Sequence, residues 1–134
     1  EISACLVGSE MCIRDSEYSA WVIGAVVSGG SVEIASQTKG TVVDHGGPVE
    51  PIFINGVAHA VAGMSRQEAN GIVKALLGKY EAKLPNPPIG KRYQDCYDMV
   101  SGKPDKEYME LYREVRREMT EQFGLKLPLS SPYL

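Results

Sequence analysis

Three stretches of the sequence carry apolar residues at helical spacing, and they limit the chain to a mostly helical fold. In residues 48–64, apolar side chains recur three and four positions apart, which is typical of an amphipathic helix. Residues 65–84 and 104–124 have the same period. A helix with one apolar stripe has to bury that stripe against another element. The sequence therefore predicts three amphipathic helices that pack on something.

Residues typical of helix ends mark where these stretches begin and stop. Ser65 and Glu68 form a capping box, in which the serine oxygen accepts from the Glu68 N–H. Pro85 predicts the end of that helix, because proline has no N–H to donate. Pro104 suits the first turn of the third helix, and Gly124 is a plausible stop.

The region before residue 48 mixes an apolar helix with short β-branched segments. Residues 18–27 read as the end of a helix, closed by Ser28, Gly29 and Gly30. Residues 31–36 and 41–43 have the composition of short strands. Strand followed by helices predicts an α/β fold, seen here as its closing β/α unit with a C-terminal helical extension.

The predicted helices present more apolar surface than two short strands can cover. We expect the stripes to stay exposed in this chain, because partners for them are missing from it. A complete (β/α)₈ barrel takes about 250 residues, more than the 134 present. The residues of the two most apolar stripes are Val49, Ile52, Phe53 and Val57, and Ile72, Val73, Leu76 and Leu77.

Residues 1–16 differ in character from the rest of the chain. They show no sustained period, and the run LVGSEMCIRD resembles the translated reading frame of a transposase adapter oligonucleotide used to prepare sequencing libraries. This predicts a non-native segment that packs against nothing, at the start of a truncated gene. Cys5 and Cys12 fall within it, which leaves Cys96 as the one cysteine expected to be native.

The composition argues against several classes of protein. The formal net charge is -3, and no basic cluster is interleaved with aromatic residues, so nucleic acid is not an expected partner. The longest apolar run is far shorter than the roughly 20 residues that a membrane span needs. Three irregularly spaced cysteines predict neither a disulfide framework nor a zinc site, and they favour a cytoplasmic protein.

Asp44 and His45 are the best local candidates for chemistry. An acid and an imidazole in a glycine-rich loop, after a β-branched cluster, can lie at the rim of a barrel where active sites collect. The competing interpretation is a turn, in which Asp44 tolerates an unusual backbone angle and caps the next helix. The turn is the favoured interpretation of the two.

The other candidate side chains have simpler interpretations. His59 is expected to be a partly exposed helix residue, not a ligand, because it lies off the apolar stripe. Cys96 is expected to be a small buried residue, not a nucleophile. Asp44, His45 and His59 have no recognisable ligand spacing, so no metal site is predicted.

Several segments together carry a resemblance to a known family. They are EIASQTKGTVVD (33–44), GVAHAVAG (56–63), LLGKYEAKL (76–84), PPIGKRYQDCYD (87–98) and KEYMELYREVRREMTEQFGL (106–125). In this order, from Ser19 to Leu127, they resemble the C-terminal part of monomethylamine:corrinoid methyltransferases. The GKRYQDCYD segment and the helix after it are the most specific part.

The resemblance implies a (β/α)₈ TIM barrel that transfers a methyl group from a small methylated amine to the cobalt of a corrinoid on a partner protein. It implies a methanogenesis-type enzyme and a homo-oligomer. In archaeal members an amber codon encodes pyrrolysine, whose ring is thought to hold the amine. The catalytic and cofactor-binding residues are expected upstream of this chain, so the chain alone is expected to be inactive and to bind no cofactor.

The domain division follows from the resemblance. Residues 1–16 are the adapter-derived segment, 17–84 the final barrel strand and helix segments, and 85–134 the C-terminal loop and helix extension. The alternative is a self-contained helical module that binds another protein and has no enzymatic activity.

Overall fold

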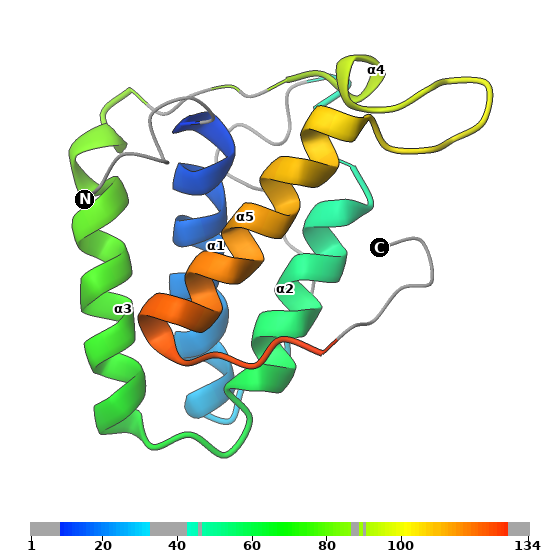
Figure 1. The fold of residues 1–134 in the computed structure, drawn as a ribbon. Coiled ribbons are helices and arrows are strands. Elements are labelled where there is room, and N and C mark those ends of the chain that lie inside the picture. Colours follow the sequence, from blue (N-terminus) through cyan, green and yellow to red (C-terminus); the bar gives the residue numbers. More distant parts are fainter. Residues whose placement is uncertain (1–8, 33–42, 46, 87–88, 90, 129–134) are drawn as a thin grey trace.

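The computed structural model describes residues 9–32, 43–45, 47–86, 89 and 91–128, which are mostly helical (Figure 1). The described residues contain no strand, only one isolated antiparallel bridge between Tyr97 and Pro104. The predicted strand residues 33–36 and 41–42 lie outside the described residues, and Val43 lies in a turn. In chain order the elements are α1 (Ser9–Val27), α2 (Val49–Ala60), α3 (Arg66–Tyr80), the 3-10 helix η2 (Glu81–Lys83), α4 (Tyr93–Cys96) and α5 (Lys106–Phe123).

Helix α1 is the centre of the fold. It contacts α2 and α3, most extensively α3, and α5 crosses over it (Figure 1). Ser16, Ser19 and Ala20 are buried small residues on α1, and small side chains let a second helix approach closely. Val22 and Ile23 are fully buried. At 19 residues α1 is the longest described helix, and none in the described part of the chain is long and apolar enough to cross a membrane.

The two ends of α1 differ in how well they match the sequence predictions. At its C-terminal end, Gly29 has a φ of 80° and the N–H groups of Ser28, Gly29 and Gly30 bond back to the last turn, which confirms the predicted stop. At its other end, Asp15 and Ser16 are only 2% and 4% exposed. The prediction that residues 1–16 pack against nothing is therefore wrong for these two. The adapter origin of residues 1–16 stays a prediction.

The apolar stripes of α2 and α3 are covered from within the chain. Val49, Phe53 and Val57 on α2 are buried, as are Ile72 and Leu76 on α3. The expectation that these stripes stay exposed is wrong, because α1 lies between the two helices and offers each of them an apolar surface. The remaining stripe residues Ile52, Val73 and Leu77 are half-buried.

Helix α5 covers the side of the core that faces the viewer in Figure 1. The ring of Tyr112 meets that of Phe53 on α2 edge to face, with centroids 6.4 Å apart. Lys79 of α3 forms an ion pair with Glu118 of α5, and this pair joins α5 to α3. After α5, the chain folds back over α2, and Arg116 donates to the Leu127 carbonyl oxygen at 2.8 Å.

The helix boundaries follow several of the predicted signals, but α2 ends at Ala60 and not at residue 64 as predicted. The Ser65 oxygen accepts from the Glu68 N–H at 3.2 Å, and Gly124 ends α5 with a φ of 67°, so both predictions are confirmed. The third helix begins later than predicted, because the side chain of Asp105 is its N-cap and Pro104 precedes that cap. Leu84, the last residue of the predicted helix 65–84, lies beyond α3 and is 46% exposed.

The exposed fraction of a leucine side chain predicts how much that side chain contributes to stability. Leu76 is fully buried where α3 faces α1, so Leu76→Ala should lower the free energy of unfolding by about 2–5 kcal/mol. Leu84→Ala, the matched control, should change it by less than about 0.5 kcal/mol. Chemical denaturation of the three proteins measures both. Equal losses for the two variants would contradict the packing described above.

Candidate functional site

The loop that enters α2 carries Asp44 and His45, the two candidates from the sequence. Asp44 has a φ of 66°, and its carboxylate is exposed. The turn interpretation is confirmed for the backbone, since aspartate is one of the few residues that tolerate this angle. It is wrong for the cap: Pro48 occupies the N-cap position, and the carboxylate that bonds in this turn is Glu50, which accepts from the Gly47 N–H at 2.9 Å.

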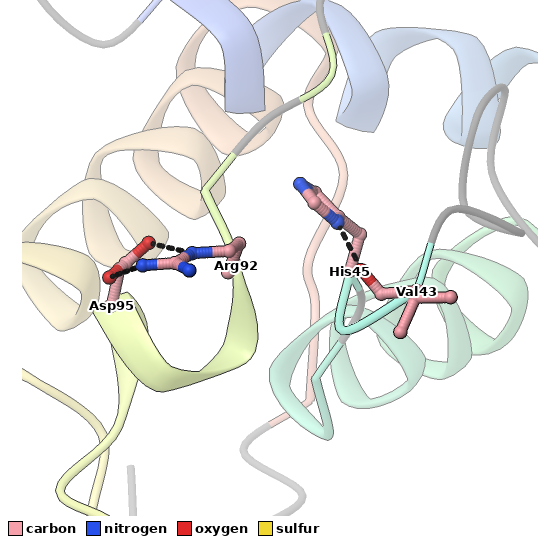
Figure 2. Close-up of polar contacts among 4 residues, drawn as sticks. All are labelled: Val43, His45, Arg92 and Asp95. Carbon is pink, nitrogen blue, oxygen red and sulfur yellow. Dashed lines mark hydrogen bonds and ion pairs between the residues drawn. The ribbon is translucent and has the colours of Figure 1, made fainter.

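His45 makes a hydrogen bond that fixes the chemical state of its ring. Its Nδ1 lies 2.8 Å from the carbonyl oxygen of Val43 (Figure 2). A carbonyl oxygen only accepts, so Nδ1 carries the proton. In the neutral ring the lone pair is then on Nε2, which can accept a proton or bind a ligand. The half-buried imidazole bonds to the backbone, and the structure does not pair it with the carboxylate of Asp44.

A charge pair at the start of α4 lies beside this loop. Arg92 Nε donates to Asp95 Oδ2 at 3.0 Å and Nη2 donates to Oδ1 at 3.2 Å, a two-point contact. These hydrogen bonds from Arg92 lower the pKa of the Asp95 carboxyl. In Figure 2 the guanidinium group points towards Asp95 and away from His45, so its charge is balanced within the pair.

The exposure of His59 and Cys96 agrees with what the sequence predicts for them. His59 is an exposed residue of α2, and Cys96 is buried at 6% exposure in α4. Among the residues that the structure describes, no three His, Cys, Asp or Glu side chains gather as a metal-binding group.

A cluster of tyrosines next to the loop was missed by the sequence reasoning. The rings of Tyr93 and Tyr97 stack with centroids 4.5 Å apart, and Tyr108 meets Tyr97 edge to face at 5.5 Å. The Tyr97 hydroxyl oxygen accepts from the Val49 N–H at 3.3 Å, across 48 positions of sequence. The signal was present, because Tyr93 and Tyr97 belong to the GKRYQDCYD segment on which the family resemblance depends most.

Burial controls the ionisation of this cluster. It raises the pKa of Tyr97 to about 12, and the bond from the Val49 N–H offsets only part of that effect. Burial, followed by the negative charge of Glu50, also raises the pKa of Tyr108 above its usual range. Both hydroxyls therefore stay neutral at physiological pH and act as hydrogen-bonding groups.

The chain is similar to known proteins over nearly its whole length. The sequence model of the family described as "Monomethylamine methyltransferase MtmB" matches residues 3–125. A protein named monomethylamine methyltransferase MtmB2, from Methanosarcina acetivorans, is 35% identical over 119 residues. One named monomethylamine methyltransferase MtmB, from Methanosarcina mazei, is 36% identical over 118 residues. The family match begins upstream of Ser19, where the sequence resemblance was expected to start.

A solved structure shares the fold. The crystal structure of the Methanosarcina barkeri monomethylamine methyltransferase (MtmB) superposes with a TM-score of 0.76 at 33% identity, over 88% of this chain. The aligned part is 25% of that protein, and the two relatives above are likewise covered over 25% of their length. The chain thus spans about a quarter of the length of the proteins it matches.

The raised pKa of Tyr97 predicts a loss of stability in alkali. The unfolded chain releases the tyrosine proton near pH 10, whereas the folded chain keeps it to about pH 12. The stabilising contribution is therefore complete below about pH 10 and falls as the pH rises through about 12, by up to about 2–3 kcal/mol. Tyr97→Phe removes the ionisable group, so its stability should fall less over that window. The denaturation midpoints of the unsubstituted protein and of Tyr97→Phe are measured at about pH 9 and about pH 11.5. Equal losses of midpoint in the two proteins would show that Tyr97 does not cause the loss of stability.

Proposed function

The chain belongs to the monomethylamine methyltransferase family, and from that premise we propose that the protein it is part of transfers a methyl group from monomethylamine to the cobalt of a corrinoid on a partner protein. The observation that carries the proposal is the family match over residues 3–125. The solved structure adds support, because the helices of this chain take the same arrangement as part of that enzyme.

The corrinoid enters this proposal as a substrate that the partner protein delivers. It supplies a reduced cobalt that accepts the methyl group. The residues that hold the amine, with pyrrolysine as one candidate, are proposed to lie in the part of the enzyme upstream of this chain.

The proposed role of this chain is to complete the enzyme around its pocket. Methyl transfer needs the donor aligned with the cobalt and water excluded, which takes a full pocket. A (β/α)₈ barrel of about 250 residues would supply that pocket, and this chain would add its last β/α unit and the C-terminal helices. We propose that the enzyme is a homo-oligomer and acts in the cytoplasm. Its reaction would belong to a methanogenesis-type metabolism.

The rival proposal is a self-contained helical module that binds another protein. One observation favours it: the core formed by α1, α2, α3 and α5 is closed by residues of this chain. Membership of the methyltransferase family favours the enzyme. The two proposals differ in what the natural gene encodes upstream of Glu17, which under the enzyme proposal is a few hundred further residues.

Activity measurements on the full-length parent test the proposed reaction. The parent, incubated with a reduced corrinoid protein, should methylate the cobalt from monomethylamine faster than from dimethylamine, trimethylamine or methanol, as seen in the visible spectrum of the corrinoid. The 134-residue chain alone should give no reaction, because it spans about a quarter of the length of its relatives and the residues that hold the amine are proposed to lie upstream of it. Methyl transfer by the chain alone, or none by a parent assayed beside an active Methanosarcina enzyme, would contradict the proposal.

The chain has two histidines, which makes a matched pair of variants. His45→Ala in the parent should lower kcat/KM about a hundredfold or more, the low end of what proton-transferring side chains contribute, because its Nε2 lone pair is available in the loop. His59→Ala should change kcat/KM by less than about twofold, since His59 is an exposed residue of α2. Equal effects of the two substitutions would remove His45 from the site.

A further inference from the structure

Helix α2 begins without a cap of its own. Its N-cap residue is Pro48, whose side chain makes no capping hydrogen bond. The first N–H groups of a helix have no partner within it and are usually satisfied by a Ser, Thr, Asp or Asn side chain just before it. Here the Val49 N–H donates to the hydroxyl oxygen of Tyr97 at 3.3 Å, and the bond is buried. A tyrosine from the C-terminal part of the chain therefore takes the place of a local cap.

The ring of Tyr97 also fills the space beside Gly47. A Cβ placed on Gly47 would lie 2.8 Å from one ring carbon of Tyr97 and 2.9 Å from its hydroxyl oxygen, closer than real Cβ contacts. The φ of Gly47 lies outside the left-handed region, so the close approach of the ring is what demands a glycine here. Tyr97 is 5% exposed and lies between the rings of Tyr93 and Tyr108, so it has little room to move aside.

A third contact holds the other end of the same loop. The backbone N–H of Tyr93 donates to the carbonyl oxygen of Asp44 at 2.6 Å. One short segment, Tyr93 to Tyr97, thus holds the loop on both sides of His45: at Asp44 through a backbone bond, and at Gly47 and Val49 through the Tyr97 side chain.

We propose that Tyr97 is a positioning residue for His45: its hydroxyl caps α2 and its ring packs on Gly47, so that the loop keeps the imidazole bonded to Val43 with Nε2 presented as a lone pair. The consequence for methyl transfer rests on the proposed function above. The geometry itself does not, and it can be tested on the 134-residue chain.

The state of the His45 ring is the readout that separates positioning from plain stabilisation. Nitrogen-15 NMR distinguishes a ring protonated at Nδ1 from one protonated at Nε2, and the two histidine signals can be assigned with His45→Gln and His59→Gln. With the rings neutral, His45 should be found mainly in the Nδ1–H form. A cap that only stabilises α2 would change the denaturation midpoint and leave this signal where it is.

Two variants act on the two contacts of Tyr97. Tyr97→Phe keeps the ring and removes the hydroxyl that caps α2. Gly47→Ala keeps the hydroxyl but pushes on the ring. In both, the His45 signal should shift from the Nδ1–H form towards the Nε2–H form. Tyr93→Phe is the matched control, because it removes a hydroxyl from the stacked neighbour and retains its backbone bond to Asp44; its His45 signal should match the unsubstituted chain.

A double substitution keeps the test valid if Gly47→Ala folds poorly. With Tyr97→Ala the ring is gone, so adding Gly47→Ala should bring no further loss in denaturation midpoint, whereas Gly47→Ala alone should lower it. A loss of the same size in both backgrounds would show that Gly47 does not contact Tyr97 and would overturn the proposal.

The outcomes also separate this proposal from the proposed function. A His45 signal unchanged in both Tyr97→Phe and Gly47→Ala overturns the positioning role, whatever the methyl-transfer assay gives. If the signal moves as expected, Tyr97→Phe in an active parent should lower kcat/KM about as much as His45→Ala does, and Tyr93→Phe should leave kcat/KM unchanged. A parent with no methyl transfer at all overturns the proposed function, and the NMR signal alone then decides the positioning of His45.

Discussion

The burial of α1 is the constraint on which the rest of the described structure depends. This helix contacts α2, α3 and α5, and Val22 and Ile23 at its centre are fully buried. Because α2 and α3 lie on opposite flanks of α1, both apolar stripes would lose much of their cover without it (Figure 1). Its buried small residues, such as Ser19, allow a neighbouring helix to approach closely, and large side chains there would push the helices apart.

Side chains of α5 connect this helical core to the candidate site. Tyr112 anchors α5 on Phe53, and four residues earlier on the same face Tyr108 meets the ring of Tyr97. Tyr97 in turn caps α2 at Val49. The loop that contains His45 is therefore held by side chains that the helical core places, although the loop is short and partly exposed. The proposed methyl transfer needs a closely aligned donor and acceptor, and support for a loop residue would serve that need.

Several local signals in the sequence predicted helix ends correctly, whereas long-range contacts could not be predicted from it. The cap at Ser65 and the left-handed Gly124 depend on a few neighbouring residues, so they could be predicted. Periodicity showed which face of α2 and α3 is apolar but not what covers it, hence the wrong expectation that the stripes stay exposed. The bond from Val49 to Tyr97 spans 48 positions, and only the folded chain brings its two ends together. Most of the two predicted strands, residues 33–36 and 41–42, lies outside the described part of the chain.

Native-state hydrogen exchange on the 134-residue chain tests most directly whether α1 joins the other helices into one unit. If it does, the amides of Val22 and Ile23 should exchange as slowly as those of Leu76 on α3 and Val115 on α5, all through the same global opening. The contradictory result would be fast, independent exchange along α1 while α3 and α5 stay protected. In that case the core would be held together without α1, and the support described for the His45 loop would need another origin.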